Sequence, residues 1–209
     1  MWVLPTLVSV PVTKNEIGAP MPRSLSLHTG KLRIPLHWKH AVFEAPSIST
    51  SDKPTLYREL VNQARALMTG ERDRVANAAN FAALVYHALP QVNWCGFYFF
   101  DGHELVVGPF QGKPACLRIA LGKGVCGTAA TTKQTQLVAD VHAFPGHIPC
   151  DSASESEVVV PMYDGHDFLI GVWDVDSPVL NRFDDDDRRG MEALVEVWIE
   201  LNDPTRFEA

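Results

Sequence analysis

Two pairs of apolar runs, each interrupted by a short turn sequence, constrain the fold of this chain most. WCGFYFF (94–100) and ELVVGPF (104–110) flank an Asp-Gly dipeptide. EVVVPM (157–162) and FLIGVWDVDS (168–177) flank the turn sequence YDGH. Apolar runs on both sides of a short Gly-containing turn are typical of a β-hairpin. The sequence therefore predicts two hairpins and, with them, an antiparallel sheet.

Segments with helical periodicity lie before and after these strands. Apolar residues recur at helical spacing in 53–69 and in 73–89, and Pro90 ends the second run. After the four aspartates 184–187, one face of a last helix carries Met191, Leu194, Val195 and Trp198. Acidic residues suit the first turn of a helix, so the aspartates indicate a helix start and not a metal site. We expect an α+β domain with a central antiparallel sheet, flanked by N- and C-terminal helices on one face.

The middle of the chain predicts shorter elements. CLRIAL (116–121) reads as a third strand, and QLVAD (136–140) as a brief one. Between them GKGVCGTAATTK indicates a glycine-rich turn that enters a short helix at about residue 125. The loop 140–156 is long for a compact domain, and such loops are usually functional or disordered.

Charge divides the chain into two parts. The whole chain of 209 residues carries a net charge of −7, which argues against non-specific nucleic-acid binding. No apolar run reaches the roughly 18 residues of a membrane-spanning helix.

Residues 1–50 are net positive and contain several prolines, so we expect a poorly ordered extension before a domain at 51–205. We expect a cytoplasmic protein, or a mitochondrial one if the extension is a transit peptide.

Four cysteines lie in the acidic part of the chain, and no two of them form a CxxC pair: Cys95, Cys116, Cys126 and Cys150. With no secretory signal, structural disulfides are disfavoured. Cys95 falls inside the first strand and is expected in the core. Cys126, in GKGVCGT, is either a small buried residue or a thiol activated at a helix N-terminus.

Cys150 allows several kinds of site. Nearby carboxylates, Asp151 first among them, disfavour its thiolate. With His142 or His147 it would form a cysteine-protease dyad, but no glycine-rich oxyanion turn follows it. The spacing H-x4-H-x2-C fits no familiar zinc signature, so no metal is expected.

A redox site is the remaining interpretation. Cysteines from three segments would meet at one end of the sheet, together with Trp94, Tyr98, Glu157, Asp174 and Asp176. Asp174 and Asp176 share one strand face because they are two residues apart. These two aspartates stand in the largely apolar run FLIGVWDVD. They are either exposed at an edge of the sheet or functional, and the pattern alone does not decide between the two.

Five segments, in this order, carry a resemblance to a known family: NWCGFYFF, GPFQGKPAC, GKGVCGTAA, DVHAFPGHIPCDSASESEVVVPM and IGVWDVDS. They closely resemble the free methionine-(R)-sulfoxide reductases, which are GAF-domain enzymes. The resemblance covers roughly residues 53–202. The family's three cysteines match Cys116, Cys126 and Cys150, and its substrate-pocket residues match Trp94, Tyr98, Glu157, Asp174 and Asp176. The chain departs from the family pattern at Cys95, Pro149 and Trp173.

The resemblance implies a mechanism and a GAF-like fold. A cysteine thiolate attacks the sulfoxide sulfur while a carboxylic acid, Glu157 or Asp176, protonates the oxygen. The resulting sulfenic acid condenses with a second thiol, and thioredoxin or a similar dithiol restores the enzyme without a bound cofactor. We expect Cys150 as nucleophile and Cys116 as resolving cysteine. Cys126 is expected to line the pocket. Whether Cys126 takes the place of Cys150 as the nucleophile stays open.

Two further expectations follow from the resemblance. The substrate would be free methionine sulfoxide, and family analogy allows a homodimer. The alternative function is a GAF-type sensor that binds a small ligand without turnover. The cysteine trio discriminates between the two, because a sensor does not require it.

Overall fold

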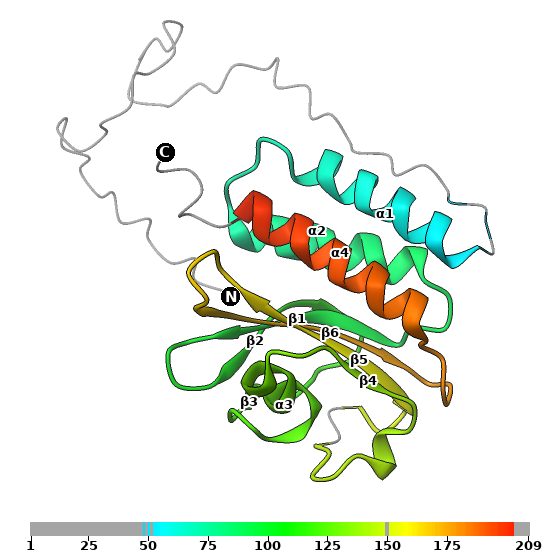
Figure 1. The fold of residues 1–209 in the computed structure, drawn as a ribbon, viewed down its shortest axis with the longest axis vertical. Helices are drawn as coiled ribbons and strands as arrows, with labels where there is room; N and C mark the ends of the chain where they lie inside the picture. Colours follow the sequence, from blue (N-terminus) through cyan, green and yellow to red (C-terminus); the bar gives the residue numbers. More distant parts are fainter. Residues whose placement is uncertain (1–47, 49, 51, 149–150, 203–209) are drawn as a thin grey trace, which may run out of the picture. The chain divides into compact units, whose positions relative to one another are not determined.

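The two expected hairpins lie side by side at the centre of one antiparallel sheet (Figure 1). The computed structural model describes residues 48, 50, 52–148 and 151–202, and in these residues the sheet has six strands in the order β3-β2-β1-β6-β5-β4. The strands are β1 (Trp94–Phe100), β2 (Leu105–Gln111), β3 (Arg118–Ile119), β4 (Gln136–Val138), β5 (Ser156–Tyr163) and β6 (Leu169–Ser177). The four hairpin strands confirm the prediction. The two edge strands are shorter than the apolar runs that predicted them.

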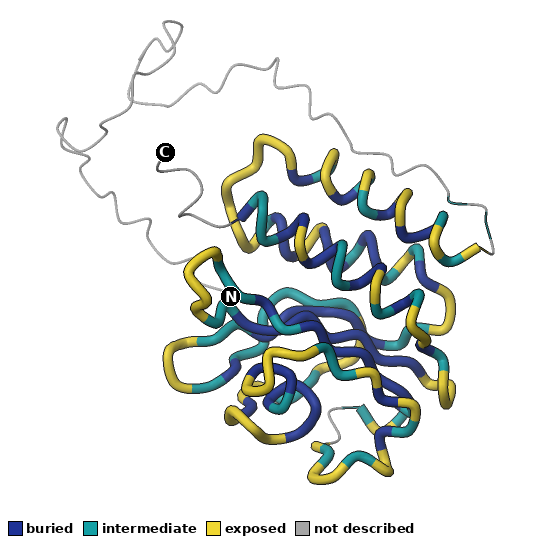
Figure 2. The backbone as a smooth tube through the Cα atoms, in the orientation of Figure 1, coloured by how far each residue is buried: buried dark blue, intermediate teal, exposed yellow. Residues whose placement is uncertain are grey.

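Three helices cover one face of the sheet, as expected (Figure 1). They are α1 (Lys53–Met68), α2 (Arg74–Ala88) and α4 (Asp185–Asn202). Asp52 and Asp73 cap the first two, each accepting a hydrogen bond from a backbone N–H three residues on. Their apolar stripes meet alternate residues of the central strands, and Figure 2 shows this layer as the buried interior. Within the described residues, no helix is long and apolar enough to cross a membrane.

A fourth helix, α3 (Gly124–Thr132), lies on the opposite face of the sheet. The expectation that helices pack on one face is therefore correct for the long helices and wrong for this short one. Small residues allow α3 to approach its neighbours closely. A Cβ atom at Gly127 would lie 2.5 Å from the carbonyl oxygen of Ala120. The 3₁₀ turn η1 (Val141–Ala143) lies at the start of the long loop.

The four aspartates begin α4, as the sequence predicts. The Asp184 carboxylate accepts hydrogen bonds from the backbone N–H groups of Asp186 and Asp187. Asp187 has a second role that the sequence pattern does not indicate. Its buried carboxylate accepts hydrogen bonds from the Tyr57 hydroxyl at 2.8 Å and from the Lys53 ammonium, and Arg182 lies at 3.2 Å. This ion-pair cluster ties α1 to the start of α4.

The packing of α1 on α4 predicts the effect of adding one methyl group. A Cβ atom at Gly190 would lie 2.0 Å from Cγ of the Tyr57 ring. Alanine favours a helix interior by up to about 1 kcal/mol over glycine, but overpacking costs about 1–3 kcal/mol. We expect Gly190→Ala to lower the free energy of unfolding in urea by about 1–2 kcal/mol, because the clash is with a buried ring.

Gly165→Ala is the matched control, because a Cβ atom there meets nothing within 4 Å. It should unfold at close to the wild-type urea concentration. A Gly190→Ala protein as stable as wild type would show that the two helices separate without cost.

Candidate active site

Three carboxyl groups are buried on the sheet face beneath α3. Glu157 stands opposite Asp176 in the pairing of β5 with β6, and Trp94 stands opposite Asp176 on the other side, in β1. Asp174 lies two residues before Asp176 and so shares its face. Each of these three acids is only 5–8% exposed. The alternative that the aspartates sit at an exposed edge is therefore wrong.

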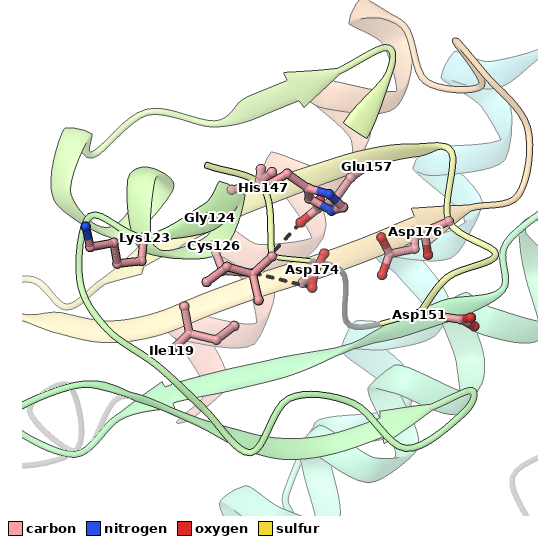
Figure 3. Close-up of a pocket in the computed structure, with 12 residues that line it drawn as sticks. Ile119, Lys123, Gly124, Cys126, His147, Asp151, Glu157, Asp174 and Asp176 are labelled. Carbon is pink, nitrogen blue, oxygen red and sulfur yellow. Dashed lines mark hydrogen bonds between the residues drawn. The ribbon is translucent and has the colours of Figure 1, made fainter. Parts of the chain in front are cut away.

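Cys126, in the first turn of α3, lies against two of these acids. Its Sγ is 3.4 Å from Asp174 Oδ2 and 3.9 Å from Glu157 Oε1, and the dashed lines of Figure 3 mark both contacts. A cavity of about 20 Å³ lies among these groups, and that volume holds about one water molecule. The lining residues come from β3, α3, the long loop, β5 and β6: Ile119, Lys123, Gly124, Val125, Cys126, His147, Ile148, Asp151, Ser154, Glu157, Asp174 and Asp176.

Burial controls the protonation of this pocket. It raises the pKa of Glu157 and of Asp176 well above the ordinary range, and the neighbouring Asp174 carboxylate adds to both effects. Burial also raises the pKa of Asp174, to about 7. Near neutral pH the pocket therefore holds carboxyl groups that still carry a proton. Such groups can act as general acids.

The same surroundings suppress the thiolate of Cys126. Burial raises the pKa of this thiol well above its ordinary value, and the Asp174 and Glu157 carboxylates raise it further. Cys126 lies at a helix N-terminus, as the sequence indicates, but it is the buried residue of the two alternatives, because these two effects outweigh activation by the helix. Cys126 stays a protonated thiol that donates to Asp174.

The remaining predicted site residues lie around the cavity at different depths. Trp94 and Tyr98 are almost fully buried, with ring centroids 5.8 Å apart, and belong to the apolar layer that includes Cys126. Neither lines the cavity in this structure. Cys116, just before β3, is partly exposed and packs against the same layer. Cys150 lies outside the described residues, as does nearly all of the expected extension 1–50.

Cys95 is separated from this site by the sheet. It is fully buried in the core between the sheet and the three long helices, where its Sγ lies 3.7 Å from the carbonyl oxygen of Ala82. Burial raises the pKa of this thiol as well. The expectation that Cys95 is a core residue is confirmed.

Loop residues that were not among the predicted site residues complete the rim. The Asn93 amide donates to Ser154 at 3.1 Å and to Asp151 at 3.3 Å. A backbone hydrogen bond from Ala153 lowers the pKa of Asp151, and Lys113 pairs with it at 3.2 Å. These positions lie in irregular segments, where no periodicity marks a residue as facing a site.

The contact between Asp174 and Cys126 makes a prediction for thiol reactivity. In Asp174→Asn the negative charge 3.4 Å from the sulfur is lost, so the pKa of the Cys126 thiol should fall toward its ordinary value. We expect iodoacetamide to label Cys126 at lower pH than in the wild type, as measured by peptide mass spectrometry over a pH series.

Asp167→Asn, which removes an exposed carboxylate paired with Lys133, is the control and should leave the labelling of Cys126 unchanged. An unaltered pH midpoint in Asp174→Asn would mean that burial alone suppresses the thiolate.

Comparison with known proteins gives the family of this chain. The GAF domain family matches residues 55–197. The chain is 49% identical over 144 residues to the free methionine-R-sulfoxide reductase of Escherichia coli (strain K12), covering 69% of this chain and 87% of that protein.

Solved structures agree in fold and in sequence. A free methionine-R-sulfoxide reductase from Neisseria meningitidis, in complex with its substrate, is 42% identical with a TM-score of 0.73, over 78% of this chain and 97% of that one. A structure described as a GAF sensor protein, from Burkholderia vietnamiensis, is 67% identical with a TM-score of 0.73, over 75% and 99% of the two chains. The chain belongs to the GAF-domain family and, within it, to the free methionine-R-sulfoxide reductases.

Proposed function

We propose that this protein reduces free L-methionine-(R)-sulfoxide to L-methionine, with a dithiol such as thioredoxin as the electron donor. The observation that carries the proposal is the convergence of Glu157, Asp174, Asp176 and Cys126 on one enclosed pocket in a chain of this family. A free amino acid brings an α-ammonium group that requires anionic partners. Its sulfoxide oxygen requires a proton donor. The pocket supplies both kinds of group.

Proton donation explains why acids and sulfur lie together. The sulfur of a sulfoxide is a poor electrophile until its oxygen takes up a proton. Burial keeps a proton on Glu157 near neutral pH, because it raises the pKa of that carboxyl group. Glu157 is therefore the acid that we assign to this step, with Asp176 beside it in the strand pairing.

The division of labour among the cysteines follows from thiolate chemistry. The raised pKa of Cys126 argues against it as the nucleophile, since the thiolate is the reactive form. We assign attack to Cys150, which takes the oxygen as a sulfenic acid while methionine leaves. The Cys116 thiol then condenses with this sulfenic acid to a disulfide and water. A dithiol reduces the disulfide and is itself oxidised.

Substrate size and charge give the specificity. The cavity of about 20 Å³ is smaller than methionine sulfoxide, so side chains that line it must move when the substrate binds. Asp174 and Asp176 would then hold the α-ammonium group, and the stacked Trp94 and Tyr98 rings would form an apolar wall for the methylsulfinyl end. A methionine within a peptide lacks the ammonium group and would leave the buried acids unpaired.

A sensor is the second candidate function, because the similar Burkholderia protein is described as a GAF sensor. A sensor would bind a small amine in the acidic pocket without consuming thiols. It would give no role to Cys116 and Cys150.

Turnover separates the two functions. With dithiothreitol in excess, the purified protein should convert free L-methionine-(R)-sulfoxide to methionine, measured by amino-acid chromatography. The S epimer and N-acetylmethionine sulfoxide should be poor substrates, because the first misplaces the oxygen and the second lacks the ammonium group. Binding of the R epimer without methionine release, by protein with all thiols reduced, would favour the sensor.

Single turnover without reductant tests the cysteine assignment. Cys150→Ser should release no methionine, because attack on the sulfoxide is lost. Cys116→Ser should still release one methionine per chain, because only the resolving step is removed. Cys126→Ser should also retain this burst. If Cys150→Ser gives the burst and Cys126→Ser does not, the two roles are exchanged.

A further inference from the structure

We propose that the acidic pocket is also a binding site for a zinc ion, with Cys126, Glu157 and Asp174 as ligands. The proposal concerns metal binding and does not require turnover. An ion held by Glu157 and Asp174 would occupy the groups that we assign to the substrate. Zinc and the sulfoxide would then exclude one another.

The three donor atoms already have the spacing of a tetrahedral site. A Zn–S bond of about 2.3 Å and a Zn–O bond of about 2.0–2.2 Å place neighbouring tetrahedral ligands about 3.5 Å apart. The Cys126 sulfur is 3.4 Å from an Asp174 oxygen and 3.9 Å from a Glu157 oxygen. One donor atom from each of the three residues lies within 4.8 Å of the others. The two sulfur–oxygen spacings are therefore within a few tenths of an ångström of tetrahedral values.

An unpartnered oxygen gives the second, independent indication of a ligand. Asp174 is 6% exposed and its carboxyl group pairs with Glu157, but its Oδ1 accepts no hydrogen bond from an N–H, hydroxyl or thiol group of the described residues. In Figure 3 this carboxylate lies close to Cys126 in the pocket. A buried carboxylate oxygen without a partner is costly, and a bound cation is one of the usual ways of satisfying it.

The donor set selects the metal. Thiolate sulfur favours zinc over magnesium and calcium, which take oxygen ligands and more of them. The cavity volume of about 20 Å³ suits one small ion. Three protein ligands leave the fourth tetrahedral position open. Binding requires the Cys126 thiolate, so the thiol proton is released to solvent.

This site differs from the zinc site weighed in the sequence. His142 of the motif H-x4-H-x2-C is exposed and lies 3.5 Å from Glu155 in the loop. The ligands proposed here come instead from α3, β5 and β6. Glu157 and Asp174 follow Cys126 by 31 and 48 residues along the chain. No local spacing rule finds such a set.

Zinc binding can be measured without substrate. Full-length protein, stripped with a chelator and kept reduced, would compete with a chromophoric chelator for Zn²⁺. We expect one ion per chain, with affinity at least about tenfold weaker in Cys126→Ser and in Asp174→Asn, since each loses a ligand. Cys95→Ala, which removes a buried thiol on the other face of the sheet, should bind as the wild type does.

Cobalt identifies the sulfur ligand directly. The wild type and Cys95→Ala should show a sulfur-to-cobalt charge-transfer band with Co²⁺, and Cys126→Ser should not. Circular dichroism checks that each variant is folded, and Glu157→Gln replaces Cys126→Ser in the affinity series if the latter is not.

Two results would overturn the proposal. The first is full retention of the ion by a folded Cys126→Ser or Glu157→Gln protein, which would place the metal on other groups. The second is displacement of zinc by equal concentrations of Mg²⁺. Competition is a further readout: Zn²⁺ should raise KM for the sulfoxide without lowering kcat. Zinc binding by a protein without turnover would contradict the proposed function alone.

Discussion

The pairing of β5 with β6 positions the groups on which the rest of the site depends. Its register sets Glu157 opposite Asp176 and leaves Asp174 on the same face. Carboxyl groups placed so deeply cannot all be ionised at neutral pH, because burial and their mutual repulsion both favour the protonated form. The sheet must therefore be rigid enough to hold them together. The three helices on its other face provide this support.

The local environment of the pocket explains an apparent conflict between sulfur and acid. A carboxylate beside a thiol suppresses the thiolate, which is unfavourable for a nucleophile but acceptable for a pocket-lining cysteine. Cys126 lines the pocket and has such a contact with Asp174. The same contacts set a thiol, whose thiolate favours zinc, beside two carboxyl groups, which zinc also accepts as ligands. One arrangement thus supports both the proposed reaction and its proposed inhibition.

Strands were more predictable from the sequence than the site was. Turn sequences and alternation gave the hairpin strands within a residue or two, because these signals are local. The face occupied by α3 is not predictable, since its residues are small and its apolar residues form no distinct stripe. The proximity of Cys126 to Asp174 depends on strand register and helix placement together. The sequence predicts Asp187 only as part of a helix start, because the burial of one aspartate among four is set by Tyr57 and Lys53 far away in the chain.

The placement of Cys95 has a consequence for a protein that uses sulfur chemistry. Adjacent residues of a strand point to opposite faces, so Trp94 borders the acidic layer while Cys95 faces the helices. The sheet therefore separates the Cys95 thiol from Cys116 and Cys126. An oxidised sulfur on one side has no path to a thiol sealed on the other without unfolding β1. The chain can carry an additional cysteine at this position without adding an incorrect disulfide partner to the cycle that we propose.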